Sequence, residues 1–395
     1  MSFELIQVIS IFSLYAGAIF MAVACGPLFK VDEAESGERN RTLDGMRALA
    51  AVGVAASHIN QYVCAYAGTS GVPHIGNHVG IIGVQMFFAL TAYLFTDRVL
   101  RAKIEPVPFL LGRIRRIIPL YTFAVFAAIL IAAFYTSGIQ ANFAQTAKET
   151  FKIYTYGFWV HHAISFKGFN MLRLLCVAWT LSYEWAFYLL LIPAAKIWNK
   201  SRIATGVLML AALALIFLQF ANKSEQVIWP FFLPGVLAAV FSFYLPKPPD
   251  TVRKLLPIAS LTFLYLMLTT EGYWTAVKLM CSTGLFLSVF YGRAPLLSWK
   301  PLQTLATISF SIYLLQYLLI CPVSLYINHN PAIFSNSVFK VASIFCVMLA
   351  LIPLSFCTYV LIERPFMTRR KQRAVVSNAA TGEVETEREL VSSVR

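Results

Sequence analysis

Two ionisable side chains lie on one apolar segment and could do chemistry together. Arg47 and His58 are eleven residues apart within residues 41–66. Eleven residues are close to three helical turns, so both side chains leave the same face, separated by roughly 16 Å of rise. That rise is about half of a bilayer core. Because ionisable groups inside a membrane are costly, an arginine at one surface aligned with a histidine near the midplane indicates a functional site.

A carboxylate is expected at a similar depth to the histidine. Glu184 lies about ten residues from the outer start of the run 174–197, and His58 lies about eight residues from the outer end of its own run. A neutral imidazole held by a carboxylate is suited to take the proton of an acceptor hydroxyl. We therefore predict His58 and Glu184 as catalytic residues. The alternative is a polar pair that only bridges two helices.

Basic residues before another apolar run could bind an anionic ligand. Arg113, Arg115 and Arg116 lie just ahead of the run 117–136. Guanidinium groups bind phosphates through paired hydrogen bonds, so these arginines could bind a phosphate-containing ligand. The alternative is that their charge only sets the orientation of the span in the membrane. Arg47 is predicted to bind the same ligand, because it lies inside its own helical run and shares a face with His58. Asp44, three residues earlier, is placed to pair with it.

The composition fixes the class of protein that must position these groups. Of 395 residues, 58% are hydrophobic and 13% are charged, and the apolar runs are long and continuous. This predicts an all-α, polytopic transmembrane helical bundle rather than a soluble domain or an outer-membrane barrel. The net charge of +14 lies at the ends of apolar runs, where it meets the bilayer surface, and no nucleic-acid motif accompanies it.

Positive charge gives the expected topology. The basic stretch 98–116 is predicted to be cytoplasmic, and an uncleaved first span near residues 5–24 places the N-terminus outside. About ten core spans then follow this extra N-terminal span, provided that residues 149–165, with His161 and His162 on the outer side, do not cross. The expected core spans are 41–66, 81–96, 117–136, 174–197, 204–221, 227–245, 255–270, 274–291, 303–325 and 338–362.

Three regions follow from this topology. Residues 1–30 are expected to form the extra helix, residues 41–367 the membrane domain and residues 368–395 a disordered cytoplasmic tail. The seven cysteines show no metal-binding or disulfide spacing, so we predict small core residues and no metal site. The sequence leaves the oligomeric state open.

Five segments form an ordered series of motifs. They are Arg47 with His58, 83–94 (GVQMFFALTAYL), 113–121 (RIRRIIPLY), 179–188 (WTLSYEWAFY) and 359–366 (YVLIERPF). In this order they resemble the motifs of the acyltransferase 3 family of integral membrane acyltransferases, over about residues 41–367. The resemblance implies a ten-span fold that moves an acyl group, commonly acetyl from coenzyme A, to an acceptor such as a cell-surface glycan. Arg113 and Arg116 suit the two-arginine motif of the family.

Two positions depart from the pattern of that family. Thr91-Ala92 stands where members usually have Ser-Gly, and Gln316 stands where the late motif usually ends in histidine. Gln316 can hydrogen-bond but cannot titrate, which leaves His58 as the main candidate base.

The resemblance and the residues together predict an O-acyltransferase of the bacterial inner membrane. Acetyl-CoA would dock on Arg47, Arg113 and Arg116, and His58 would act as base or as acyl carrier on a hydroxyl of a polysaccharide or lipid-linked sugar, such as lipopolysaccharide O-antigen or exopolysaccharide. A peptidoglycan sugar, a small lipophilic acceptor and a succinyl donor stay open. The rivals are a proton-coupled transporter with His58 and Glu184 as a relay, and a non-catalytic membrane scaffold.

Overall fold

The computed structural model describes residues 3–29, 40–68, 74–102, 104–139, 142–159, 163–221 and 227–367, and within them the chain is almost entirely helical. The predicted all-α class is confirmed. The expected disordered tail 368–395 and the pair His161-His162 lie outside the described residues. In chain order the elements are α1 (Phe3–Cys25), α2 (Arg41–Tyr66), α3 (His74–Leu100), α4 (Pro106–Tyr135), α5 (Phe143–Thr155), β1 (Ser165–Phe166), β2 (Phe169–Asn170), α6 (Leu172–Leu175), η2 (Cys176–Ala178), α7 (Trp179–Lys200), α8 (Arg202–Ala221), η3 (Trp229–Phe232), α9 (Leu233–Tyr244), α10 (Asp250–Thr269), α11 (Ala276–Tyr291), η4 (Pro295–Ser298), α12 (Lys300–Thr307), α13 (Ser309–His329), α14 (Ser337–Thr358) and η5 (Tyr359–Glu363).

Within the described residues, eight helices are long and apolar enough to cross a bilayer, which makes this a multi-pass membrane protein. They begin with α1 and include α3, α4, α7, α8, α10, α13 and α14. The segments Trp229–Tyr244 and Ala276–Tyr291 are shorter apolar helices. Helix α2 has 26 residues and reaches about 39 Å. Together, the eight long helices, the two shorter ones and α2 account for the expected core spans and the extra N-terminal span.

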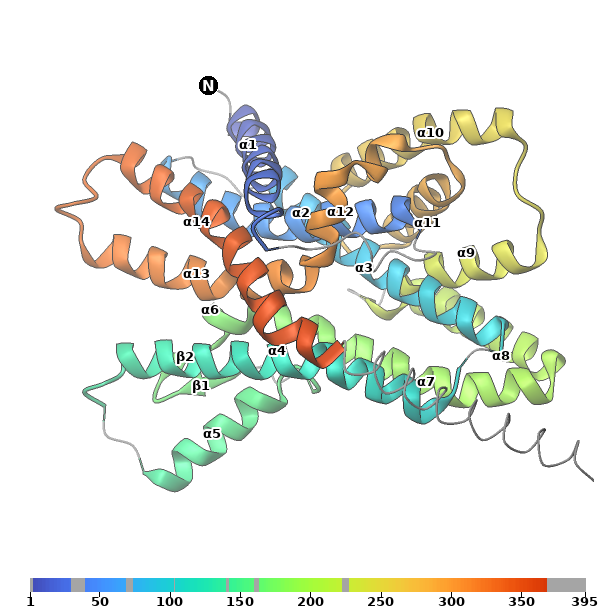
Figure 1. The fold of residues 1–395 in the computed structure, drawn as a ribbon, viewed down its shortest axis with the longest axis horizontal. Coiled ribbons are helices and arrows are strands. Elements are labelled where there is room, and N and C mark those ends of the chain that lie inside the picture. Colours follow the sequence, from blue (N-terminus) through green and yellow to red (C-terminus); the bar gives the residue numbers. More distant parts are fainter. Residues whose placement is uncertain are drawn as a thin grey trace, which may run out of the picture.

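The central helix is α2, which carries both Arg47 and His58. It packs against α1, α3, α12, α13 and α14, and most of its residues are buried. Small side chains such as Ala51 and Ala55 let these neighbours approach closely. In contrast, α8 and α10 lie at the periphery and have one buried residue each (Figure 1). The polar groups of α2 are therefore surrounded by protein rather than by lipid.

The N-terminal helix α1 runs antiparallel to α2. Near its start, the Oε1 atom of Gln7 accepts a hydrogen bond of 3.2 Å from the backbone N–H of Gly76, which opens α3. In its middle, the Tyr15 hydroxyl donates to the Leu49 carbonyl of α2 over 2.9 Å. The extra helix is therefore packed against the central helix α2, while residues such as Phe12 and Phe20 on its other side are exposed.

Between α4 and α7, the residues that the structure describes contain no helix of spanning length. Helix α5 has 13 residues, about 20 Å against a bilayer core of about 30 Å. A short hairpin follows, in which β1 pairs antiparallel with β2. The Tyr121 hydroxyl of α4 ties the segment down, since it donates to the Tyr154 carbonyl (3.0 Å) and accepts from the Gly157 N–H (2.9 Å). A short helix and a hairpin held against α4 are consistent with the prediction that residues 149–165 do not cross the membrane.

The prediction of one continuous span over residues 303–325 is wrong. The helix breaks at Ile308, between α12 and α13. At the break, the Ser309 hydroxyl donates to the Ala306 carbonyl over 2.8 Å. The last span also ends differently from an ideal helix, since η5 is a π-helical turn.

The connections gather at two ends of the bundle. Figure 1 shows the α4–α5 and α13–α14 connections at one end, on the left, and the α7–α8 and α9–α10 connections at the opposite end. The second pair carries Lys200, Arg202 and Lys247.

Candidate active site

A cleft between five helices collects most of the predicted site residues. It is bounded by α2, α3, α4, α7 and α13, and its space is about 780 Å³ including the part open to solvent. Arg47, Arg113, Arg116 and Glu184 all line it. These residues come from three helices, so the fold brings together groups that are up to 137 positions apart, from 47 to 184.

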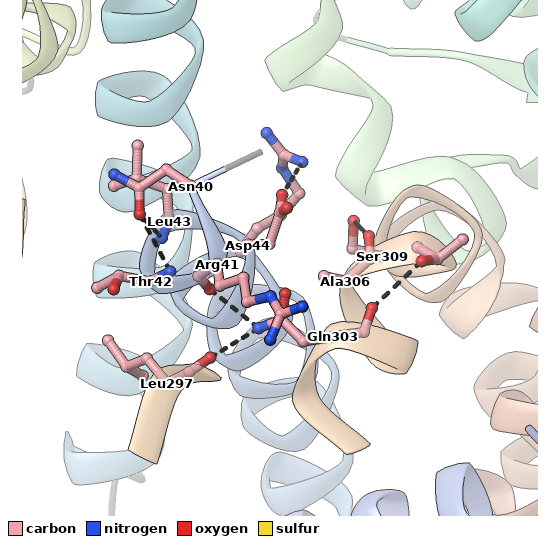
Figure 2. Close-up of polar contacts among 11 residues, drawn as sticks. Asn40, Arg41, Thr42, Leu43, Asp44, Leu297, Gln303, Ala306 and Ser309 are labelled. Atoms are coloured by element: carbon pink, nitrogen blue, oxygen red, sulfur yellow. Dashed lines mark hydrogen bonds and ion pairs between the residues drawn. The ribbon is translucent and has the colours of Figure 1, made fainter. Parts of the chain in front are cut away.

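The first turn of α2 holds Arg47 in place. The Asn40 side chain caps the helix by accepting hydrogen bonds from the backbone N–H groups of Thr42 (3.1 Å) and Leu43 (3.4 Å) (Figure 2). The Arg47 guanidinium donates to the Asp44 carboxylate over 3.0 Å, as the spacing of three residues predicts. Arg47 is therefore already partly neutralised within its own helix.

A glutamine from α12 anchors the same end of α2. The Gln303 amide donates to the carbonyls of Arg41 (2.9 Å) and Leu297 (2.8 Å), which joins α2 to η4 as Figure 2 shows. The approach is so close that a Cβ atom at Gly45 would lie 2.0 Å from the Leu297 carbonyl oxygen. Only glycine fits there, which explains the Asp44-Gly45 sequence before Arg47.

Arg113 and Arg116 face the cleft from one side of α4, because residues three apart share a helix face. The Arg113 guanidinium lies over the Phe95 ring, 4.7 Å from its centroid, and its buried Nε has no hydrogen-bond partner. Within the described residues neither Arg113 nor Arg116 forms an ion pair. Arg115 does not line the cleft. The cleft thus offers two guanidinium groups free to bind an anion.

Glu184 belongs to this arginine cluster. Its Oε2 accepts a 2.7 Å hydrogen bond from the Tyr188 hydroxyl one turn further along α7. The positive charges acting on its carboxylate are those of Arg116, Arg113 and Arg47. Three guanidinium groups against one carboxylate leave the cleft lining with a surplus of positive charge.

His58 lies three turns further along α2 and is not part of the cleft lining. Its Nδ1 is 2.9 Å from Oε1 of Gln316 on α13. Its ring lies 4.8 Å from the Tyr317 ring, centroid to centroid, tilted by 48°. Within the described part of the chain no hydrogen bond or ion pair joins His58 to Glu184, so each has its own partner and the expected contact between them is absent.

Tyr313 connects the histidine to the cleft. It lines the cleft, and its hydroxyl lies 2.8 Å from Thr180 Oγ1 and donates to the Val177 carbonyl over 3.0 Å. Its backbone carbonyl accepts a 2.8 Å hydrogen bond from the Gln316 amide, which in turn faces His58. Gln316, a departure from the family pattern, is thus the direct partner of the predicted base.

The sequence reasoning missed a buried polar group behind the cleft. Glu363, in the π-helical turn η5, accepts a hydrogen bond from the Ser311 hydroxyl, which also accepts one of 3.0 Å from Thr358 Oγ1. The positive charge of Arg116 also acts on Glu363. The signal was present, since Glu363 lies in the last motif, and π-helical turns are frequent at functional sites.

The second departure from the family pattern, Thr91-Ala92, lies partly in the cleft. Thr91 lines the cleft, and Ala92 is completely buried on the other side of α3. Within the described ranges, no group of three or more histidine, cysteine or acidic side chains is arranged to hold a metal ion.

The apolar helices define an integral membrane protein, and the charge of the cleft lining suits an anionic ligand. Comparison with known families assigns it further: residues 40–360 match the acyltransferase domain family, so the chain belongs to this family of membrane acyltransferases. Helix α1 precedes the matched region.

Among curated proteins, the chain is similar to the peptidoglycan O-acetyltransferase OatA of Listeria monocytogenes. The two are 26% identical over 315 residues, which cover 70% of this chain and 48% of the relative. The chain thus spans about half the length of the curated relative that it matches. No solved structure matched the chain.

Proposed function

We propose that this protein is an O-acetyltransferase that takes an acetyl group from cytoplasmic acetyl-CoA and transfers it to a hydroxyl group of a cell-surface or lipid-linked carbohydrate. The observation that carries the proposal is the cleft with Arg47, Arg113 and Arg116, three turns of α2 away from His58. Membership of the acyltransferase family and the similarity to a peptidoglycan O-acetyltransferase support the reaction type.

The donor would bind by its phosphates. Coenzyme A is a polyanion, and Arg113 and Arg116 present guanidinium groups that no carboxylate pairs with in the described residues. Glu184 would lower the repulsion among the arginines before the donor binds. The thioester arm of the donor would then run inward past Tyr313 towards His58.

The histidine would act on the acceptor hydroxyl. In the direct reaction, His58 takes the hydroxyl proton while the oxygen attacks the thioester carbonyl. A carbon–oxygen bond forms, the carbon–sulfur bond breaks, and the coenzyme A thiolate leaves and recovers the proton from the imidazolium. In the two-step alternative His58 first carries the acetyl group, which predicts ping-pong kinetics.

The orientation of the protein in the membrane completes the proposal. The end that carries Lys200, Arg202 and Lys247 would face the cytoplasm by the positive-inside rule, in a bacterial inner membrane (Figure 1). The N-terminus of α1 would then lie outside, because Gln7 contacts the opposite end of the bundle at Gly76. We further propose residues 41–367 as the catalytic domain, α1 as an added helix and the tail 368–395 as cytoplasmic.

The test is the mass of surface glycans from cells that express the protein. Wild type should add acetyl groups, His58→Ala at matched membrane levels should add none, and His329→Ala should behave as wild type because His329 is exposed at the end of α13. Acetylation that survives in His58→Ala would remove the proposed base. A proton-coupled transporter would instead show substrate flux that depends on a proton gradient and is indifferent to acetyl-CoA.

A further inference from the structure

The orientation of one buried amide is fixed by its two neighbours. Gln316 is fully buried on α13, with its Nε2 2.8 Å from the Tyr313 carbonyl oxygen and its Oε1 2.9 Å from Nδ1 of His58. A backbone carbonyl can only accept a hydrogen bond, so the amino group of Gln316 must face Tyr313. The oxygen of the amide must then face the histidine.

This orientation assigns the proton on the histidine ring. The Gln316 oxygen can only accept, so Nδ1 of His58 must carry a hydrogen to make the contact. In the neutral imidazole, Nε2 is then the nitrogen with the free lone pair. Within the described residues nothing hydrogen-bonds to Nε2, and the His58 side chain is only half-buried.

We propose that Gln316 is a positioning residue that holds His58 in the Nδ1–H tautomer and so makes Nε2 the atom that accepts the hydroxyl proton or the acetyl group. The proposal rests on the proposed function. It goes beyond that function by assigning the reacting atom and the residue that selects it.

The chemistry of an amide suits this task. When Nε2 takes a proton, Nδ1–H continues to donate to the same oxygen, so the hydrogen bond survives both states of the ring. A carboxylate at this position would add a charge that holds the imidazolium proton more strongly, whereas the neutral amide orients the ring without that extra attraction. The Tyr317 ring, 4.8 Å away, packs against the imidazole and limits its rotation.

The same contacts link tautomer selection to the donor cleft. Tyr313 provides the carbonyl that orients Gln316, and its own ring lines the cleft. The Tyr313 hydroxyl is held by Thr180 and by the Val177 carbonyl at the start of α7. Gln316 is therefore bonded to the backbone of a residue whose side chain a bound donor would contact.

The direct test is ¹⁵N nuclear magnetic resonance of the full-length protein in lipid nanodiscs, with ¹⁵N-labelled histidine. The His58 signals are assigned by their loss in His58→Gln. At a pH where the ring is neutral, wild type should show a protonated Nδ1 and an unprotonated Nε2, and Gln316→Leu should shift the signals towards the Nε2–H form. A wild-type spectrum with Nε2 protonated would overturn the proposal, and this readout needs no enzyme activity.

Kinetics supply the second readout. Gln316→Leu should lower kcat by about 100-fold or more, the usual contribution of a general base, while the KM values of donor and acceptor change less than about twofold. Gln316→Glu keeps an acceptor oxygen for Nδ1–H and should recover part of kcat. Ser324→Ala is the matched control, because it removes a 3.0 Å contact to Tyr66 on the same two helices and should leave kcat unchanged.

The outcomes separate the two proposals. If wild type transfers acetyl groups and Gln316→Leu keeps its kcat, Gln316 is not a positioning residue and the inference fails while the function stands. If wild type transfers none, the proposed function fails, and the resonance spectrum still decides which nitrogen of His58 carries the hydrogen.

Discussion

Replacing Arg116 by glutamine should weaken the binding of acetyl-CoA while leaving chemistry at the bound donor intact. Arg116 lines the cleft and forms no ion pair in the described residues, so its guanidinium is available to a phosphate. A hydrogen bond between charged partners contributes about 1.5–3 kcal/mol. With each 1.4 kcal/mol worth about a factor of ten, the KM for acetyl-CoA should rise between about 10-fold and about 150-fold.

The neighbouring Arg115 provides the matched control. It carries the same charge on the same turn of α4 but does not line the cleft. Arg115→Gln should therefore change the donor KM by less than about threefold, within the about 0.5 kcal/mol typical of substitutions away from a site. The assay is the initial rate of acetyl transfer by purified protein in nanodiscs, at varied acetyl-CoA and constant acceptor.

Replacing Phe95 tests the donor site with a smaller expected effect than replacing Arg116. The Arg113 guanidinium lies 4.7 Å from its ring centroid, and such a contact contributes about 0.5–1 kcal/mol at exposed sites. Phe95→Leu should thus raise the donor KM only about two- to fivefold by loosening Arg113. Equal effects of Arg115→Gln and Arg116→Gln would show that general positive charge, not the cleft, binds the donor, and the reasoning from the cleft lining would be refuted.

Three further outcomes are expected. Gly235→Ala should lower the thermal stability of the protein in detergent strongly, because the new Cβ would lie 1.9 Å from the Ala89 carbonyl oxygen where α9 meets α3; an unchanged melting temperature would contradict this close packing. Tyr188→Phe should raise the donor KM a few-fold with kcat nearly unchanged, since it removes only the 2.7 Å hydrogen bond to Glu184; a loss confined to kcat would instead place Glu184 in the chemical step. Ser335→Cys, exposed in the α13–α14 connection, should react with a membrane-impermeant maleimide in intact cells, and labelling only after lysis would reverse the proposed orientation.

The positions of most helices could be predicted from the sequence because the length of an apolar run is a local property of the chain. Most of the apolar runs of spanning length form single helices in the structure, and the runs 227–245 and 303–325 are exceptions. The break at Ile308 escaped prediction because apolar residues continue on both sides of it and only the Ser309 hydroxyl marks the turn. Breaks of this kind depend on a side chain bonding its own backbone, which hydropathy does not record.

The candidate site could be predicted in its residue types but not in its pairings. Arg47, Arg113 and Arg116 were expected to act together, and they do line one cleft. The expected partner of His58 was Glu184, because helical rise gives both a similar depth in the membrane. Depth says nothing about which faces of two helices meet, and in the structure the face of α13 that carries Gln316 meets His58 instead.

The separation of His58 from Glu184 changes what each group can do. In the cleft, the carboxylate of Glu184 lies among three like charges, where it lowers their mutual repulsion and leaves a positive surplus for an anionic donor. A histidine placed in that cluster would be held neutral by the same field, but it would share the site with phosphates. On α2, outside the cleft lining and beside the neutral amide of Gln316, its free lone pair would be kept apart from the phosphates of the proposed donor.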